Sequence, residues 1–235
     1  LISCGLRGAQ AKDEALGDLD PERLFALARS HSVSAMVCMA LEKTAAFGDA
    51  DPSVKAKWLD AKNKAIRKSL LLDAECAAIM EELERAEIWH MPLKGSVLKN
   101  WYPQYGMREM ADCDILFDGD RRGRVRELFL ARGYTAELFD ISNHDVYHKP
   151  PVYNFEMHAE LFSPRASGDW VGKYAHVKER LLPDEGKKYR CHFTPEDFYV
   201  FVIAHAYKHY SHSGTGIRTL ADIFVMNQRL GPGMD

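Results

Sequence analysis

Hydrophobic residues recur at helical spacing through the first third of the chain. Residues 21–45 carry two such runs, which predict two short helices that break around residues 30–32. Asp51 and Pro52 are typical of a helix start, and the apolar stripe after them predicts one long helix that ends near Glu87. The residues of this stripe are Trp58, Ala65, Leu72, Cys76, Ile79 and Leu83. We interpret the stripe as a packing seam and not as a cofactor-binding surface.

The middle of the chain alternates between strand-type and helix-type patterns. The predicted strands cover residues 89–93, 115–117, 134–138, 146–149 and 152–161. An amphipathic helix is predicted over residues 120–132, and it stops at Gly133, a typical C-terminal signal. This order predicts a small mixed sheet with helices on one side.

The last third of the chain is predicted to be mostly helical. Thr194 and Pro195 form an N-cap followed by proline at the first helical position. The glycines at 214 and 216 break the chain before a second apolar run. The expected elements are a strand pair at 187–193 and helices at 195–210 and 217–229.

Composition agrees with a compact α+β protein. The chain has 235 residues, of which 46% are hydrophobic, and this is enough for a substantial core. We divide it into an N-terminal helical segment, a central core with a small mixed sheet, and a C-terminal, mostly helical cap. The expected boundaries are 1–87, 88–165 and 166–235.

Charge and cysteine content indicate which classes of partner and which cellular compartment to expect. A net charge of −3 gives no basic surplus, so nonspecific nucleic-acid binding is not indicated. The first half of the long helix is rich in lysine, and we interpret this as a solvated face instead of an RNA-binding surface. The five cysteines are scattered without a C-x-x-C pattern, which favours a cytoplasmic protein with no disulfide partner. No apolar run approaches the roughly 18 to 20 residues that span a membrane, so we expect no membrane association.

Two aspartates one residue apart are the first candidate for chemistry. Asp112 and Asp114 lead into the predicted strand 115–117, and the period of two places both carboxylates on one face. Like charges at this spacing are costly to bury unless a cation compensates them, and a hard divalent ion such as Mg²⁺ prefers oxygen ligands. The alternative is a solvated aspartate pair at the start of a strand.

A glycine-serine turn precedes this pair in the sequence. Gly95 and Ser96 follow the predicted strand 89–93, where glycine allows a phosphate to approach the backbone and free N–H groups at a helix start attract anions. Lys94 and Arg108 flank the turn as candidate phosphate-binding cations. Taken together, the turn and the aspartates indicate chemistry on a nucleoside triphosphate.

A third acid is available on the last predicted strand. Asn154, Glu156, His158 and Glu160 alternate with apolar residues and therefore share one face. A third carboxylate beside Asp112 and Asp114 is what a two-metal phosphoryl-transfer site needs. The spacing alone leaves Glu156 and Glu160 as alternatives.

Several histidines lie on the predicted helix 195–210 and its continuation. His205, His209 and His212 follow one another at steps of four and three, close to one helix face. Two histidines four apart are able to bind zinc, but no glutamate base stands beside the first one. We instead expect His205, Lys208 and His209 to form a polar edge facing the cleft or to join helices. Arg218 and Asp222 are also four apart, and we expect them to pair.

These motifs together resemble a known family. The matching residues are Leu93-Lys94-Gly95, Tyr102-Pro103, Arg108, Asp112 to Leu116, Phe155 to His158, Pro195 to Asp197, His205, Lys208-His209, Arg218 and Asp222. They resemble the uncharacterised bacterial nucleotidyltransferases of the polymerase-β-like superfamily. The likeness covers roughly residues 93–226, and it departs from the family at Ala159, where tryptophan is common.

The resemblance implies a Mg²⁺-dependent nucleotidyltransferase, with Mn²⁺ as an alternative ion and an NTP such as ATP as co-substrate. Asp112, Asp114 and Glu156 are then the catalytic metal ligands, because Glu156 and not Glu160 matches the family's acid two residues before histidine. The implied reaction moves a nucleoside monophosphate to an acceptor hydroxyl and releases pyrophosphate. The acceptor stays open among a small molecule, a tRNA end and a protein. Two other classes are kept as alternatives: a catalytically silent nucleotide-binding module, and a metal-dependent hydrolase built on the histidines.

Overall fold

A computed structural model describes residues 1–12, 16, 20–163 and 170–234 of the chain. Four short helices form the N-terminal region: α1 (Ile2–Arg7), α2 (Pro21–Ser30), α3 (Ser34–Leu41) and α4 (Ala45–Asp49). In this region α2 and α3 pack on the first half of the long helix α5 (Pro52–Arg85), and α1 packs on α3. The expected break between α2 and α3 is confirmed. The sequence reading missed α1 and α4 because each is too short for a hydrophobic period to be visible.

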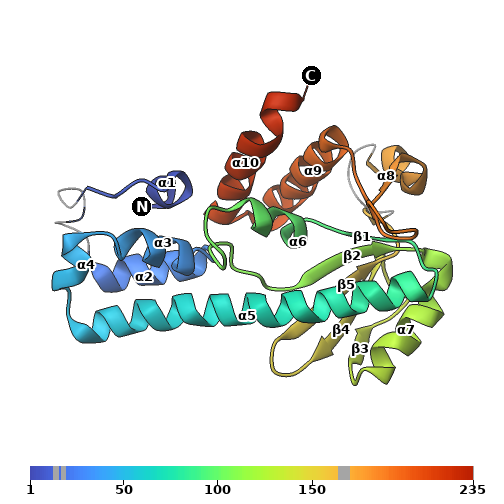
Figure 1. Cartoon of the computed structure of the whole chain (residues 1–235), viewed down its shortest axis with the longest axis horizontal. Coiled ribbons are helices and arrows are strands. Elements are labelled where there is room, and N and C mark those ends of the chain that lie inside the picture. The colour runs from blue at the N-terminus through green and yellow to red at the C-terminus, as the bar shows by residue number, and fades with distance from the viewer. Residues whose placement is uncertain (13–15, 17–19, 164–169, 235) are drawn as a thin grey trace.

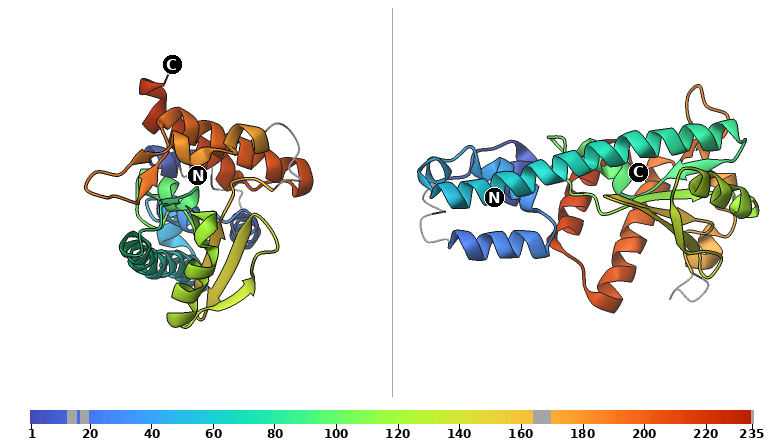
Figure 2. Two further views of the ribbon diagram at one scale, coloured as in Figure 1. Left: turned by 90° about the vertical axis from the view of Figure 1, so that its right-hand side faces the viewer. Right: turned by 90° about the horizontal axis from the view of Figure 1, so that it is seen from below.

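Helix α5 connects two hydrophobic cores. Its start is confirmed, because the Asp51 side chain accepts the Ser53 N–H at 2.7 Å and Pro52 occupies the first turn. Trp58, in the first half, is buried among the N-terminal helices, whereas Leu83, in the second half, is buried under the sheet. Figures 1 and 2 show α5 extending along both regions. The predicted packing seam is therefore confirmed.

Five strands form a mixed sheet in the order β1-β2-β5-β4-β3. Their bounds are β1 (His90–Pro92), β2 (Cys113–Phe117), β3 (Thr135–Leu138), β4 (His144–Lys149) and β5 (Tyr153–His158). Strands β2 and β5 are parallel, and the other neighbours are antiparallel. Each strand lies close to the segment that the sequence predicts.

Helices cover both faces of this sheet, so the expectation of helices on one side was wrong. Ile115 and Phe117 of β2 pack against α5 and α7 (Arg122–Ala131). Leu116, which points the other way, belongs to a core that includes Phe201 of α9. Every residue of β2 is buried, so both faces of this strand need a covering layer.

The C-terminal part is mostly helical, as expected, and packs over the second face of the sheet (Figure 1). Its elements are α8 (Trp170–Tyr174), β6 (Leu182–Pro183), β7 (Cys191–His192), α9 (Pro195–Ser213) and α10 (Ile217–Leu230). The short helix α6 (Gly95–Leu98) lies between the sheet and α10. The expected core-to-cap boundary at residues 165 and 166 lies outside the described residues.

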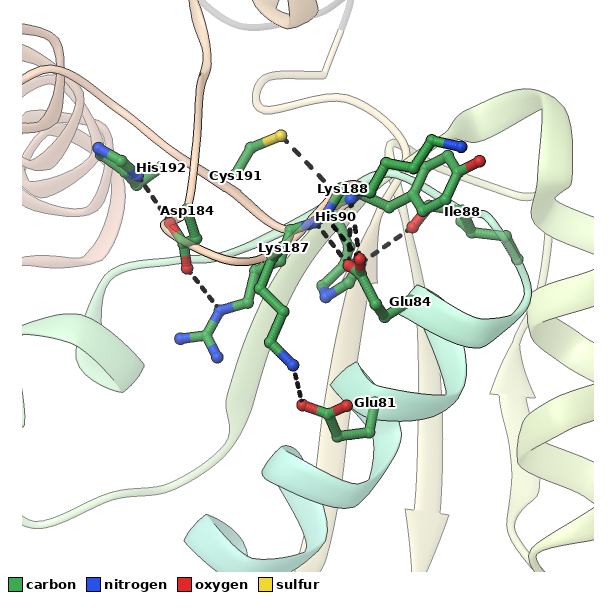
Figure 3. Close-up of polar contacts among 11 residues, drawn as sticks. Glu81, Glu84, Ile88, His90, Asp184, Lys187, Lys188, Cys191 and His192 are labelled. Carbon is green, nitrogen blue, oxygen red and sulfur yellow. Dashed lines mark hydrogen bonds and ion pairs between the residues drawn. The ribbon is translucent and has the colours of Figure 1, made fainter.

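Glu84, near the end of α5, fixes the loop between β6 and β7. Its carboxylate accepts the backbone N–H groups of Lys188, Tyr189 and Arg190 at 2.7, 3.1 and 2.9 Å (Figure 3). One turn earlier, Glu81 forms an ion pair with Lys187. Three charge-assisted bonds to the backbone hold the loop more firmly than one exposed ion pair.

Replacing Glu84 should therefore destabilise the protein more than replacing Glu81. We expect Glu84→Ala to lower the free energy of unfolding by about 1–2 kcal/mol, because backbone N–H groups lose their acceptor. Glu81→Ala, the matched control, should leave it unchanged, since its pair with Lys187 is exposed. Urea denaturation of both variants measures the difference. Equal midpoints would contradict this account of the loop.

Candidate functional site

Strands β2 and β5 place two of the predicted acids side by side. They are parallel neighbours, with Asp114 opposite Glu156 and Leu116 opposite His158. Ile115 and Met157, between these residues, are buried toward α5 and α7. Side chains alternate along a strand, so Asp114 and Glu156 point to the opposite face.

Asp114 is buried and accepts hydrogen bonds from two side chains, one of them a cation. Its Oδ1 accepts a hydrogen bond from Lys94 Nζ at 2.8 Å and another from His158 Nε2 at 2.8 Å. Burial alone would raise the pKa of Asp114, but the Lys94 ammonium and the His158 bond outweigh it and hold the pKa below its usual range. Asp114 is therefore an anion throughout the neutral pH range.

His158 is a neighbour of Asp114 and not a free metal ligand in this arrangement. Burial lowers the pKa of His158 to about 4, so the ring is neutral near pH 7. A carboxylate only accepts hydrogen bonds, so Nε2 carries the proton that it donates to Asp114. The other ring nitrogen, Nδ1, is buried and has no partner within the described ranges.

The other two carboxylates hold their protons more strongly. Burial, and then the negative charge of Asp114, raise the pKa of Asp112. The same two causes raise the pKa of Glu156 to about 7. One ligand atom each of Asp114, Glu156 and His158 lie within 4.8 Å of one another. Mutual repulsion of this kind is what a bound cation relieves.

Glu160 takes no part in this cluster. It follows the end of β5, its side chain is exposed, and its backbone N–H donates to the Asn143 carbonyl at 3.2 Å. The strand ends two residues earlier, so the alternation that grouped Glu160 with Glu156 does not extend to it. Of the two candidate third acids, only Glu156 lies beside Asp114.

The predicted glycine turn lies at the edge of the same cleft. Lys94 adopts φ 44° and ψ −113°, a strained conformation for a residue with a side chain. The turn is closed by the Ser96 N–H, which donates to the Leu93 carbonyl at 3.0 Å. The N–H groups of Lys94 and Gly95 donate to no protein group in the described part of the chain. A Cβ at Gly95 would lie 2.4 Å from Arg108 Nη1, so only glycine fits here.

The structure does not bring the Ser96 side chain to the acids. Its Oγ lies 3.4 Å from Cys113 Sγ, and it lines a separate cavity with Trp101 and Phe198. Because α6 turns directly after Gly95, the serine points to the other side of the helix. Of this dipeptide, only Gly95 lines the cleft.

Arg108 is fixed by Asp222 of α10. Its Nε donates to Asp222 Oδ1 at 2.7 Å and its Nη2 to Oδ2 at 2.9 Å, and Tyr102 Oη donates to the same Oδ1 at 2.6 Å. Burial alone would lower the pKa of Arg108, but Asp222 outweighs it and raises that pKa. The expected pairing of Arg218 with Asp222 was wrong, because Arg108 occupies both oxygens of that carboxylate with Nε and Nη2.

These residues line a cleft of about 490 Å³ between the sheet, α6, α9 and α10. His205, Lys208 and His209 come from α9 and form part of its wall, as expected for a polar edge. His205 and His209 share a hydrogen bond of 3.3 Å between their Nε2 atoms. Burial and the positive charge of Lys94 lower the pKa of His205 to about 2, so its ring is neutral.

The zinc alternative gains no support from this pair. In the described residues, the group of three potential metal ligands is Asp114, Glu156 and His158, and it includes neither His205 nor His209. The side chain of His212 lies outside the described residues. A His-based site would need a third ligand beside the pair.

The sequence reading missed two cleft residues, Asn143 and His144. His144 lies opposite His158 in the β4–β5 register, and the two ring centroids are 5.1 Å apart. Burial lowers the pKa of His144, followed by the charge of Lys94. Both residues fall in a predicted turn before β4, and no sequence signal indicated which strand they would face.

A family model describes almost the whole chain. The model of the uncharacterised nucleotidyltransferases matches residues 17–235. The chain belongs to this family. The match begins within the N-terminal helical segment, so it extends further than the likeness over residues 93–226 that the motifs carry. Family membership identifies the protein as a transferase enzyme.

Two solved structures match part of the chain. A lincosamide antibiotic adenylyltransferase, LnuA, with lincomycin bound, is 15% identical with a TM-score of 0.45, covering 66% of this chain and 95% of its own. An antigenic nucleotidyltransferase-like protein from Paracoccidioides brasiliensis is 13% identical with a TM-score of 0.45, covering 67% of this chain and 76% of its own. Among curated proteins, none matches the sequence. No described helix has the length and apolarity needed to cross a membrane.

The raised pKa of Glu156 predicts a pH dependence of stability. A carboxyl whose pKa rises on folding stabilises the folded state at low pH, and this contribution is lost as the pH rises through the folded value near 7. Glu156→Gln should therefore gain roughly 1–3 kcal/mol over the wild type between pH 5 and pH 8 in metal-free buffer.

Urea denaturation of both proteins across this range, without metal, measures the difference. Glu160→Gln is the matched control and should follow the wild type at every pH. A constant offset between Glu156→Gln and the wild type would contradict the raised pKa.

Proposed function

We propose that the protein transfers a nucleoside monophosphate from an NTP to an acceptor hydroxyl and releases pyrophosphate. The observation that carries this proposal is the juxtaposition of three acids with the open turn at Gly95. Asp112, Asp114 and Glu156 line the same cleft as Lys94 and Gly95. Phosphoryl transfer requires acids that hold a metal and, opposite them, backbone N–H groups that donate hydrogen bonds to phosphate oxygens.

The donor set fits a hard divalent cation. Asp112, Asp114 and Glu156 would hold Mg²⁺ or Mn²⁺, because carboxylate oxygens suit these ions and two of the three acids have raised pKa values that a cation would lower. When bound, the metal supplies charge stabilisation for the reacting phosphate oxygens. His158 orients Asp114 through its Nε2–H.

The residues around the turn are proposed to hold the phosphates. The N–H groups of Lys94 and Gly95 point to no protein acceptor in the described ranges, and such groups bind anionic oxygens. Lys94 Nζ contacts Asp114, and a phosphate offers it a second anionic partner. Arg108 keeps Nη1 beside Gly95 while Asp222 holds its other two nitrogens. The Ser96 hydroxyl has no role in this proposal.

Glu156 is also the carboxylate best suited to take the proton of the acceptor hydroxyl. It lies opposite Asp114 on the neighbouring strand and lines the cleft, where an acceptor hydroxyl would approach the bound metal. His205, Lys208 and His209, on the opposite wall, are proposed to contact the nucleotide or the acceptor.

The acceptor is proposed to be a small molecule, a tRNA end or a protein in the cytoplasm. An extended RNA surface on α5 is not part of this proposal, because its lysines have protein partners. Lys57 pairs with Glu22, Lys62 with Glu42, and Lys64 with Asp60.

The decisive experiment incubates the protein with each α-labelled NTP, Mg²⁺ or Mn²⁺, and a panel of hydroxyl-bearing acceptors. Release of pyrophosphate together with a labelled product supports the proposal. Metal-dependent NTP binding without product would identify a catalytically silent module. Tight zinc binding without nucleotide binding would favour the hydrolase.

Asp112→Asn and Asp114→Asn should both abolish turnover but differ in stability. Asp112→Asn should keep or raise the melting temperature, because burial and Asp114 disfavour its charge. Asp114→Asn should lower it, since Lys94 and His158 lose a buried anionic partner.

Thermal denaturation and Mn²⁺ titration read out the two effects separately. Asp118→Asn, at the end of the same strand, is the control and should retain metal binding. Wild-type Mn²⁺ affinity in both site variants would refute the assignment of these acids.

Gly95→Ala should impair triphosphate binding in a folded protein. The new methyl group would lie 2.4 Å from Arg108 Nη1, which displaces the arginine and fills the approach to the turn. We expect ATP affinity to fall by about 10-fold or more, as when a charge-assisted hydrogen bond is lost, with adenosine affinity unchanged. Gly123→Ala, where a Cβ meets no atom within 4 Å, is the control. Equal losses for ATP and adenosine would show that the turn is only structural.

A further inference from the structure

A second cavity adjoins the cleft on the side of Asp112. It measures about 330 Å³ and lies between α5, the segment 109–111 and the first turn of α10. Ala111 and Arg218 line both spaces, so Arg218 stands at their junction. The two cavities therefore share part of their wall.

Two half-buried cations of this cavity donate to backbone carbonyls and not to carboxylates. Arg218 Nη1 donates to the Glu109 carbonyl at 2.9 Å, and Lys68 Nζ to the Ala111 carbonyl at 3.0 Å. Among the residues that the structure describes, neither has an ion pair within 4.0 Å. The contacts leave both positive charges without a paired anion, on either side of Met110.

None of the nearby acids forms an ion pair with Arg218 or Lys68 in the described part of the chain. The Glu109 carboxylate, which lines the cavity, accepts the Ala35 N–H at 2.9 Å. Asp222 is held by Arg108 and Tyr102. Asp112, which follows the segment 109–111, forms no ion pair with either cation among the described residues.

The pKa of Arg218 agrees with the absence of a paired carboxylate in the described residues. Burial lowers its pKa, and the neighbouring Arg108 lowers it further. A half-buried guanidinium without a carboxylate is costly, and a phosphate is the anion whose geometry suits its fork of donors. Lys64, which lines the same cavity, differs because it is exposed and paired with Asp60.

We propose that Arg218 and Lys68 form a phosphate-binding subsite in the cavity that adjoins the cleft. The subsite deepens the proposed function and rests on it for its biological role. Its ligand is a phosphate group from one of two sources, the polyphosphate tail of the NTP or a phosphate carried by the acceptor. Arg218 and Lys68 would reach this phosphate while they keep their hydrogen bonds to the carbonyls of segment 109–111, which precedes Asp112.

The test measures binding of inorganic pyrophosphate, ATP and adenosine by calorimetry, without any turnover. The variants are Lys68→Gln and Arg218→Gln, and Arg67→Gln and Arg229→Gln are matched controls on the same helices. Both controls are exposed and line neither cavity. Circular dichroism checks that each variant is folded. Lys68 lies on a helix surface, so Lys68→Gln still tests the proposal if Arg218→Gln folds poorly.

We expect each site variant to weaken pyrophosphate binding by about 10-fold, as when a charge-assisted hydrogen bond is lost, while the controls bind like the wild type. An equal loss for ATP, with adenosine unchanged and with ATP displacing pyrophosphate, assigns the subsite to the NTP tail. Unchanged ATP affinity, with pyrophosphate still binding at saturating ATP, assigns it to a phosphorylated acceptor.

Two results would overturn the subsite: no pyrophosphate binding to the wild type, or equal affinity in the wild type and both site variants. These outcomes are separable from failure of the proposed reaction. Turnover that depends on Asp112 and Asp114, together with unchanged pyrophosphate binding in the variants, refutes only the subsite. Weakened pyrophosphate binding without any turnover refutes only the reaction.

Discussion

The buried carboxylate of Asp222 is the contact on which the arrangement of the cleft depends. It accepts hydrogen bonds from Tyr102 and from Nε and Nη2 of Arg108, and so joins α10 to the segment between α6 and β2. Removing one partner of such a buried pair typically costs about 3–5 kcal/mol, because the other charge is left unpaired. The same contact sets the position of Arg108 Nη1 against Gly95, and with it the floor of the cleft.

Helix α5 supplies the second constraint, because it belongs to two cores at once. Trp58 anchors the N-terminal helices, while Cys76, Ile79 and Leu83 pack under β2 and β5. The strand that carries the acids is thus held from below by α5 and from above by α9. Repelling carboxylates are held together best on such a rigid support, and Asp114 and Glu156 both lie on strands of this sheet.

Charge is distributed unevenly around the cleft. Asp114 is neutralised by Lys94, whereas Asp112 and Glu156 are protonated more readily because burial and Asp114 oppose their charge. Arg108 is compensated by Asp222, whereas Arg218 and Lys68, within the described ranges, donate to carbonyl oxygens and form no ion pair. The acids thus favour a cation and the free donors favour an anion, a combination that suits a metal-bound polyphosphate.

The sequence by itself determined the features that depend on local spacing. Periodicity and capping residues predicted α5 and α9, and the period of two placed Asp112 and Asp114 on one face. Tertiary structure decided the rest. The parallel pairing of β2 with β5 brings Glu156 beside Asp114, the direction of α6 turns Ser96 away, and the packing of α10 gives Asp222 to Arg108 in place of Arg218. Strand register and helix packing join residues far apart in the chain, and no local pattern encodes those distances.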